Sequence, residues 1–425
     1  LRLKEIATGD EAGTWGNSTN TNLELIAEKF GTGSEALSDA STATITMADG
    51  ASDAFRSFSL TLTGSLSQAC TVTLAPNTLS NVWVVQNSAG DTVTLTQGTG
   101  SNVVIPNGGI KMIATDGAGS GAAVTDVLDL TGGTGNVGLG SGSLGTSLTT
   151  GTDNVAIGEN AGDALSTGSD NTLVGDNAGG ALTTGGENIA IGSAALDAED
   201  TGNRSVAIGF EALTAQNNDA NNYNVAVGYV AGKAVTSGVR NNFYGAESGE
   251  ALTTGDDNIA IGYQTLTSET AGNRTVAIGN NALDAQNSST DTNIYNVGVG
   301  YAAGGAITTG ANNVLLGALA GDALTDADAN VAIGKSALSA DTLGSKSIAI
   351  GLGALQSQNF STATDSLNTA VGHGVGASMT TGQQNTLIGA EAGDAMTDAL
   401  LNVAVGYQAL SSETSGRKSI GIGYG

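Results

Sequence analysis

The sequence is poor in the residues on which most enzymes and nucleic-acid-binding proteins depend. Its 425 residues include one cysteine, one histidine, two prolines and 13 lysines and arginines. A single cysteine, Cys70, excludes an intrachain disulfide and a cysteine-based zinc site. Forty acidic residues give a formal net charge of −27, and a surface of that sign repels the phosphates of nucleic acid and of anionic lipid. The scarcity of proline also excludes a collagen triple helix.

Long apolar runs are missing as well. No stretch approaches the roughly 18 consecutive apolar residues of a membrane-spanning helix, so we expect no membrane insertion, and no signal peptide is apparent. Disorder is disfavoured, because 40% of the residues are hydrophobic and they recur at fixed places. Glycine, with 65 residues, is about twice as frequent as usual.

The pattern Asn/Ser-x-Ala-Ile/Val-Gly recurs along the last two thirds of the chain. Its first copy ends at Gly140, and most steps between copies are 17 residues. In one copy Val155 and Ile157 alternate around Ala156, which predicts a short strand with two faces. Gly158 then allows a turn that a Cβ would hinder. The later copies end at Gly158, Gly175, Gly192, Gly209, Gly228, Gly245, Gly262, Gly279, Gly300, Gly317, Gly334, Gly351, Gly372, Gly389, Gly406 and Gly423.

A second period is superimposed on the first. Longer steps after Gly209, Gly279 and Gly351 divide the repeats into blocks of four coils, 70–72 residues apart. The extra residues lie in polar segments at 216–223, 286–295 and 358–367. Two nested periods indicate duplication of a larger unit.

The 17-residue units are expected to fold by stacking on one another. A 17-residue unit cannot bury a core alone, whereas stacked units share one. We expect Ala, Val, Ile and Leu to point inward, with Leu165 as a second apolar anchor. The predicted fold is all-β: residues 131–425 form a parallel β-roll or β-solenoid rod of 17 coils, roughly 80 Å long at ~4.8 Å per coil. The small bulk per coil favours an intertwined homotrimer, with a monomeric β-helix as the alternative.

The repeat resembles those of two groups of fibrous proteins. Asn154-Val155-Ala156-Ile157-Gly158-Glu159-Asn160-Ala161 is similar to the head repeat of trimeric autotransporter adhesins. That resemblance implies three chains, each winding a left-handed parallel β-roll about a common axis. The 17-residue length, with turns such as Thr183-Thr184-Gly185, also resembles repeats of phage tail-fibre-like proteins. The resemblance covers residues ~136–425.

Residues 1–31 differ from the rest and suggest a docking segment. The stretch Gly9-x-x-x-Gly13-x-Trp15-Gly16-Asn17-x-x-Asn20 resembles the N-terminal segment of many phage tail-fibre proteins. Beyond it, Leu23, Ile26, Ala27 and Phe30 have the spacing of a short amphipathic helix, capped by Asn or Thr just before Leu23. Trp15 either anchors the loop to a core or, with Leu23, Ile26 and Phe30, docks to another virion protein.

Residues 32–130 read as a small β-sandwich. Apolar and polar residues alternate at 58–62 and 70–74, and further strand patterns occur at 82–85, 92–96, 103–105 and 110–113. Cys70 lies in one of these runs, so a buried structural thiol is expected.

No catalytic constellation is apparent, so we expect neither an enzyme nor a cofactor or metal site. His373 occupies a repeat position where sister copies carry Tyr229 or Tyr301, which indicates a surface variant. Paired carboxylates, such as Asp256-Asp257 and Glu199-Asp200, occur in repeat turns and are the candidates for glycan hydrolysis.

The first functional hypothesis is a structural phage tail fibre in the virion. It would be a homotrimer that docks to other tail proteins through its N-terminus. It would attach to a host receptor, either a glycan or an outer-membrane protein, with the three polar segments as contact loops or padding. The alternative is a trimeric autotransporter-type adhesin on the bacterial surface. A glycan hydrolase comes third, and an ice-binding threonine array fourth.

Overall fold

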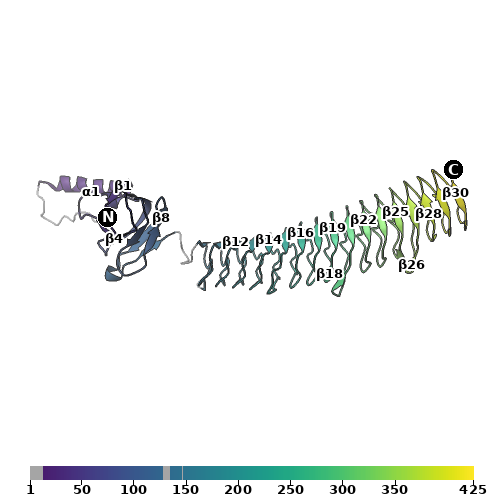
Figure 1. Ribbon diagram of the computed structural model, residues 1–425, viewed down its shortest axis with the longest axis horizontal. Coiled ribbons are helices and arrows are strands. Elements are labelled where there is room, and N and C mark those ends of the chain that lie inside the picture. Colours follow the sequence, from purple (N-terminus) through teal and green to yellow (C-terminus); the bar gives the residue numbers. More distant parts are fainter. Residues whose placement is uncertain (1–12, 128–134, 146) are drawn as a thin grey trace. The chain divides into compact units, whose positions relative to one another are not determined.

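The computed structural model describes residues 13–127, 135–145 and 147–425. The chain forms two compact units, Leu1–Leu130 and Thr131–Gly425, and each is described by itself. The first carries a helix and two small sheets, and the second is a long parallel β-solenoid (Figure 1).

The helix α1 (Trp15–Lys29) begins eight residues earlier than the sequence pattern predicts. Thr14 precedes it without a side-chain cap, so the expected cap just before Leu23 is wrong. Leu25 and Ser18 are the residues of α1 that are buried. Lys29 ties the end of α1 to the sheet, because its Nζ donates to Oδ1 of Asn81 at 2.5 Å and to the carbonyl of Val82 at 3.2 Å.

Two sheets packed on each other follow the helix. One has the order β1-β3-β5-β8-β9 and the other β2-β4-β6-β7. The strands are β1 (Thr32–Leu37), β2 (Thr42–Thr46), β3 (Ser59–Gly64), β4 (Cys70–Ala75), β5 (Ser80–Ser88), β6 (Val93–Thr96), β7 (Val103–Ile105), β8 (Ile110–Asp116) and β9 (Val124–Asp126), with single 3-10 turns at η1 (Ala54–Arg56) and η2 (Gly119–Gly121).

The pairing in this unit is parallel at first and antiparallel at the end. The strand β3 pairs in parallel with β1 and β5, and β4 does so with β2 and β6, whereas β7, β8 and β9 pair antiparallel. The first six strands therefore alternate between the two sheets, as successive coils of a solenoid do. Trp83 is fully buried, stacks on Phe55 at 4.7 Å between ring centroids, and donates from Nε1 to the Phe55 carbonyl at 2.8 Å. The Cys70 thiol is buried, as expected.

The second unit is a stack of near-identical coils, each contributing one three-residue strand. Seventeen strands pair in parallel and in register, so residues one coil apart lie side by side (Figure 1). They define about 16 turns of the solenoid. The strands are β10 (Val137–Leu139), β11 (Val155–Ile157), β12 (Thr172–Val174), β13 (Ile189–Ile191), β14 (Val206–Ile208), β15 (Val225–Val227), β16 (Asn242–Tyr244), β17 (Ile259–Ile261), β19 (Val276–Ile278), β21 (Val297–Val299), β22 (Val314–Leu316), β23 (Val331–Ile333), β25 (Ile348–Ile350), β27 (Thr369–Val371), β28 (Thr386–Ile388), β29 (Val403–Val405) and β30 (Ile420–Ile422).

The core of the solenoid closes within a single chain. In each strand the middle residue points inward, as Ala156 does, and the first and third point outward. Ala161 and Leu165 fill the rest of that coil's interior and are fully buried. The expectation that valine and isoleucine point inward is therefore wrong at the first and third strand positions. A coil this narrow leaves room in mid-strand mostly for alanine, with Leu173 and Phe243 among the larger exceptions.

The repeat glycines turn the chain out of each strand. Gly245 has φ +134°, and a Cβ there would lie 2.3 Å from the carbonyl oxygen of Gly262 in the next coil. The same conformation and close glycine-to-glycine contact recur at Gly158, Gly192 and Gly389, among others. Only glycine combines this φ with so close an approach of two backbones.

Candidate functional site

The outer side of the long sheet is apolar. It is formed by the first and third residues of the strands, and we call it the apolar face. Parallel in-register stacking places these side chains in two columns. The column of third residues is apolar in every strand, whereas the column of first residues is interrupted by Thr172, Asn242, Thr369 and Thr386. The apolar side chains of the face exposed by more than about a third are Val137, Leu139, Ile157, Ile189, Ile191, Tyr244, Ile261, Val314, Leu316, Ile348, Ile388, Ile420 and Ile422. Exposed aromatic rings follow the strands in several coils, and Phe210 stacks on Tyr229 at 5.6 Å.

The inner corner before most strands is held by a buried asparagine. Oδ1 of Asn154 accepts the backbone N–H of Asn171 in the next coil at 3.0 Å. Nδ2 of Asn154 donates to the carbonyl of Gly168, which closes its own coil. This asparagine ladder satisfies backbone groups that would otherwise be buried without partners. Its members are Asn136, Asn154, Asn171, Asn188, Asn224, Asn241, Asn258, Asn296, Asn313, Asn330, Asn368, Asn385 and Asn402.

The ladder is interrupted once in every block of four coils, and in the first three blocks a glutamine bridges the gap. At the first gap Ser205 replaces asparagine, and Nε2 of Gln216 donates to its Oγ at 2.8 Å. Oε1 of Gln216 accepts from Nδ2 of Asn224, the next ladder residue, at 2.8 Å. The next two gaps, at Thr275 and Ser347, are bridged in the same way by Gln286 and Gln358. Ser419 occupies the equivalent position in the last coil.

A buried carboxylate one coil earlier holds each glutamine. Glu269 is fully buried, and its Oε2 accepts from Nε2 of Gln286 at 2.8 Å. Its Oε1 accepts four backbone N–H groups, those of Thr270, Ala271, Gly272 and Ser288, at 2.8–3.1 Å. Convergent N–H groups of this kind form a nest for an anion. Glu199 and Asp341 hold the equivalent positions with similar partners.

The three long loops, at 216–223, 286–295 and 358–367, begin at these glutamines. Each loop lies in parallel against the coil before it. The pairs are β18 (Gly272–Asn273) with β20 (Thr292–Asn293), β24 (Gly344–Ser345) with β26 (Thr364–Asp365), and the bridge of Asn203 with Asn221. β18 and β26 lie at the end of the coil opposite the stacked strands (Figure 1). The loops are therefore ordered projections at one edge.

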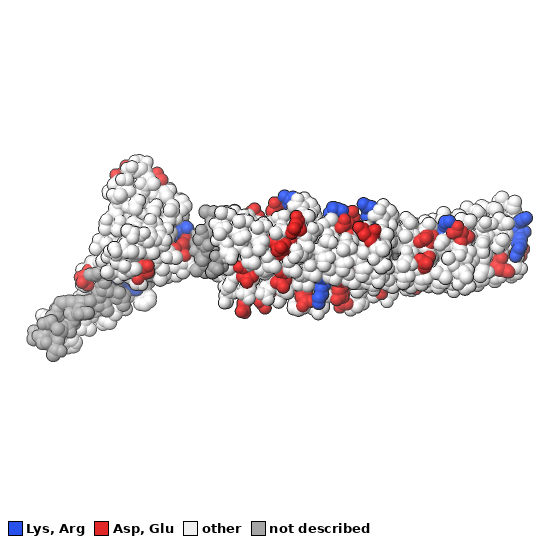
Figure 2. All heavy atoms as spheres, turned by 90° about the horizontal axis from the view of Figure 1, so that it is seen from below, with Lys and Arg blue, Asp and Glu red and all other residues white. Residues whose placement is uncertain are grey.

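Along the β-solenoid, acidic and basic side chains form small mixed groups, with wide uncharged areas between the groups (Figure 2). Most of the ion pairs join neighbouring coils, as between Arg204 and Glu187 at 2.9 Å and Lys233 and Glu211 at 2.5 Å. Pairing with Glu187, together with a hydrogen bond to Tyr223, raises the pKa of Arg204 further above its usual range.

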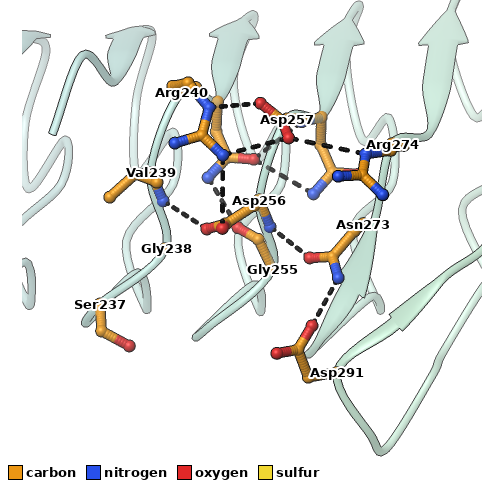
Figure 3. Close-up of polar contacts among 12 residues, drawn as sticks. Ser237, Gly238, Val239, Arg240, Gly255, Asp256, Asp257, Asn273, Arg274 and Asp291 are labelled. Atoms are coloured by element: carbon orange, nitrogen blue, oxygen red, sulfur yellow. Dashed lines mark hydrogen bonds and ion pairs between the residues drawn. The ribbon is translucent and has the colours of Figure 1, made fainter.

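The largest such group lies between the first two long loops, and we call it the bay (Figure 3). Arg240 holds Asp257 through two contacts at 2.5 and 3.1 Å and lies 3.5 Å from Asp256. The guanidinium of Arg274 lies 3.7 Å from the second oxygen of Asp257. The hydrogen bond from Arg240 lowers the pKa of Asp257.

Half-exposed tyrosines stand at the two ends of the bay. Tyr223 is 48% exposed and Tyr295 49%. The guanidinium of Arg204 lies 5.7 Å from the Tyr223 ring centroid and donates to its hydroxyl at 2.9 Å. The guanidinium of Arg274 lies 5.9 Å from the Tyr295 ring centroid and donates to the Tyr295 hydroxyl at 3.3 Å.

The sequence-predicted docking residues lie on the outer side of α1. Trp15, Leu23 and Phe30 are 66, 59 and 83% exposed, and Ile26 is half-buried. At 100° per residue these four fall on one stripe of the helix, opposite the buried Leu25. Trp15 therefore does not anchor a loop to the core. Its burial was one of two predicted possibilities, and its exposure leaves it available for docking.

The candidate hydrolytic carboxylates have structural partners. Glu199 follows a repeat turn and is fully buried, and Asp256 and Asp257 contact Arg240. His373 is exposed. Among the residues that the structure describes, no group of three or more acidic, histidine or cysteine side chains is arranged to hold a metal ion. Within the same residues, no helix has the length and apolarity to cross a membrane.

Comparison with known proteins finds no matching family model, no matching curated protein and no matching solved structure. The class that the geometry itself defines is an elongated β-solenoid rod, which fits a structural or adhesin-like fibre in general.

Proposed function

We propose that the protein is a non-enzymatic phage tail fibre, a homotrimer in which the repeat units associate through their apolar faces. The observation that carries the proposal is the apolar column of third strand residues, which runs through all seventeen strands beside a first-residue column that is apolar in thirteen of them. Soluble monomers rarely expose an apolar surface of such extent.

The size of the face makes association favourable. Full burial of a valine or isoleucine stabilises by about 1.5–3 kcal/mol, so covering the exposed third of one such side chain contributes roughly 0.5–1 kcal/mol. The most exposed members of the face therefore supply on the order of 10 kcal/mol per chain. That is comparable to the ~4–15 kcal/mol that association costs in lost freedom of motion.

Attachment through two separate regions completes the proposal. The exposed stripe of Trp15, Leu23, Ile26 and Phe30 would dock to another virion protein, and the long loops would meet a host receptor. Localisation in the virion rests on the resemblance of the N-terminal segment. A trimeric autotransporter-type adhesin on the bacterial surface is the second candidate, and the rod with its apolar face fits it equally.

Light scattering on the full chain tests the trimer. We expect a mass of three chains for the wild type and of one chain for the double variant Ile189→Asp, Ile191→Asp. Both side chains point away from the chain's own core, so circular dichroism should stay unchanged. The control places aspartates at two exposed turn threonines, Thr167 and Thr184, and should remain trimeric. A monomeric wild type would refute the trimer and leave a self-sufficient single-chain solenoid.

A further inference from the structure

The bay is long enough for an extended ligand. The first and second long loops bound it, four coils apart, which is roughly 19 Å at ~4.8 Å per coil. Three coils without long loops form its floor, where Arg240, Asp256, Asp257 and Arg274 meet (Figure 3). The loop walls are fixed, because Asn218 donates to the carbonyl of Ser237 and Asn273 donates to Asp291.

The floor retains unused hydrogen-bonding groups. Arg240 uses Nε and Nη2 for the two aspartates, and Arg274 uses Nε and Nη1. Within the described part of the chain, the remaining Nη1 of Arg240 and Nη2 of Arg274 have no protein partner. The four side chains of the floor are between about a third and a half exposed. Planar donors and acceptors held at fixed spacing suit a ligand rich in hydroxyl groups.

The charge of the bay indicates which hydroxyl-rich ligand it suits. The two arginines of the floor are balanced by Asp256 and Asp257, and Asp219 and Asp291 on the adjoining loops are acidic. An anionic ligand would therefore find no uncompensated positive charge. The tyrosine rings at both ends offer flat apolar surfaces with a polar rim, which suit the C–H faces of sugar rings.

We propose that the bay binds a neutral oligosaccharide in an extended conformation, with Tyr223 and Tyr295 stacking on its ends and Arg240, Asp256 and Arg274 binding its hydroxyls. This inference deepens the proposed attachment function and rests on it. It singles out the first of the two intervals between long loops. The second interval has the same spacing but presents Asn312, Ala329 and Lys346 at the positions of Arg240, Asp257 and Arg274.

The experiment is binding of the full chain to an array of neutral oligosaccharides of graded length and of acidic ones bearing sialic or uronic acids. We expect binding to neutral ligands that strengthens with length until the bay is spanned. Arg240→Gln should weaken it about tenfold. Tyr223→Asn should do so as well, and asparagine is tolerated at the positive φ of that position. Lys346→Gln, at the position in the second interval that corresponds to Arg274, should leave it unchanged.

Three results would overturn the inference: no binding to any neutral oligosaccharide, preference for the acidic ones, or equal binding by Arg240→Gln, Tyr223→Asn and wild type. The native mass of each sample separates this failure from that of the proposed function. A trimer that binds no neutral glycan contradicts only the assignment of the bay. A wild-type monomer contradicts the proposed trimeric fibre, whatever it binds. Unchanged circular dichroism shows that a variant's loss of binding is not a loss of fold.

Discussion

The buried carboxylate Glu269 offers the sharpest test of how the long loops are held. We consider the variant Glu269→Gln, which keeps the shape of the side chain and removes its charge. The Nε2 of Gln286 already donates to Oε2 of Glu269, and four backbone N–H groups point at Oε1. Either orientation of the new amide therefore sets its NH₂ group against donors. Rotating Gln286 to relieve the conflict would break its bond with Asn296.

The expected loss follows from these contacts. A hydrogen bond to a charged group contributes about 1.5–3 kcal/mol and a neutral one about 0.5–1.5 kcal/mol. One buried donor left without an acceptor costs a further ~1–3 kcal/mol. The lower cost of burying a neutral group offsets part of this. We therefore expect local opening to become easier by about 3 kcal/mol, which is roughly 100-fold.

Amide hydrogen exchange is the appropriate assay, because a repeat array need not unfold in a single step. The N–H groups of Gly272 and Ser288 should exchange roughly 100-fold faster in the variant, whereas those of β11 should not change. Glu250→Gln, at a half-buried position outside the interior, is the control. Exchange at Ser288 within a few-fold of wild type would refute the view that the carboxylate holds the loop.

Two further predictions concern the coils themselves. Gly245→Ala should destabilise the rod by about 3 kcal/mol or more, since a strained backbone alone costs on the order of 1–3 kcal/mol and the new Cβ would meet the Gly262 carbonyl. Faster proteolysis between β16 and β17 would show it, and an unchanged cleavage rate would contradict it. Burial, with Asp163 and Asp176 nearby, raises the pKa of Asp197, so its ionised form opposes folding and its protonated form does not. Asp197→Asn should therefore raise the melting temperature at pH 7, by an amount that shrinks as pH falls through the carboxyl range. A constant difference at all pH values would exclude titration as its origin.

Much of the fold follows from local pattern. The glycine period predicts the number of strands and their stacking, because each Gly must turn the chain at the same point of every coil. The local pattern does not predict which strand side chains point into the core. Val155 and Ile157 alternate with Ala156 whichever side is the interior, and only the narrow cross-section of the coil selects alanine. The stripe from Leu23 to Phe30 was similarly predictable, although Trp15 was expected in a loop before the helix. A stripe does not show whether the neighbouring sheet covers it.

The buried carboxylates were missed because their neighbours in sequence are turn residues. Glu199 is followed by Asp200, Thr201 and Gly202, a polar run typical of an exposed loop. The sequence nevertheless contains a pattern that identifies the buried carboxylates. Each acid is followed by a glutamine one full coil later, and a serine or threonine replaces the ladder asparagine between them, as in Glu199, Ser205 and Gln216. Residues one repeat apart are contacts in a solenoid, so this spacing identifies the bridge.

The glutamine bridge makes the blocks of four coils interchangeable. Each bridge ends by accepting a hydrogen bond from the first asparagine of the next block, so every block boundary presents the same chemistry. A fibre gene could lose or gain one block without altering any joint in the interior. Its product would change in length by roughly 19 Å and in projecting loops by one, so reach and the number of contacts with a surface would vary together.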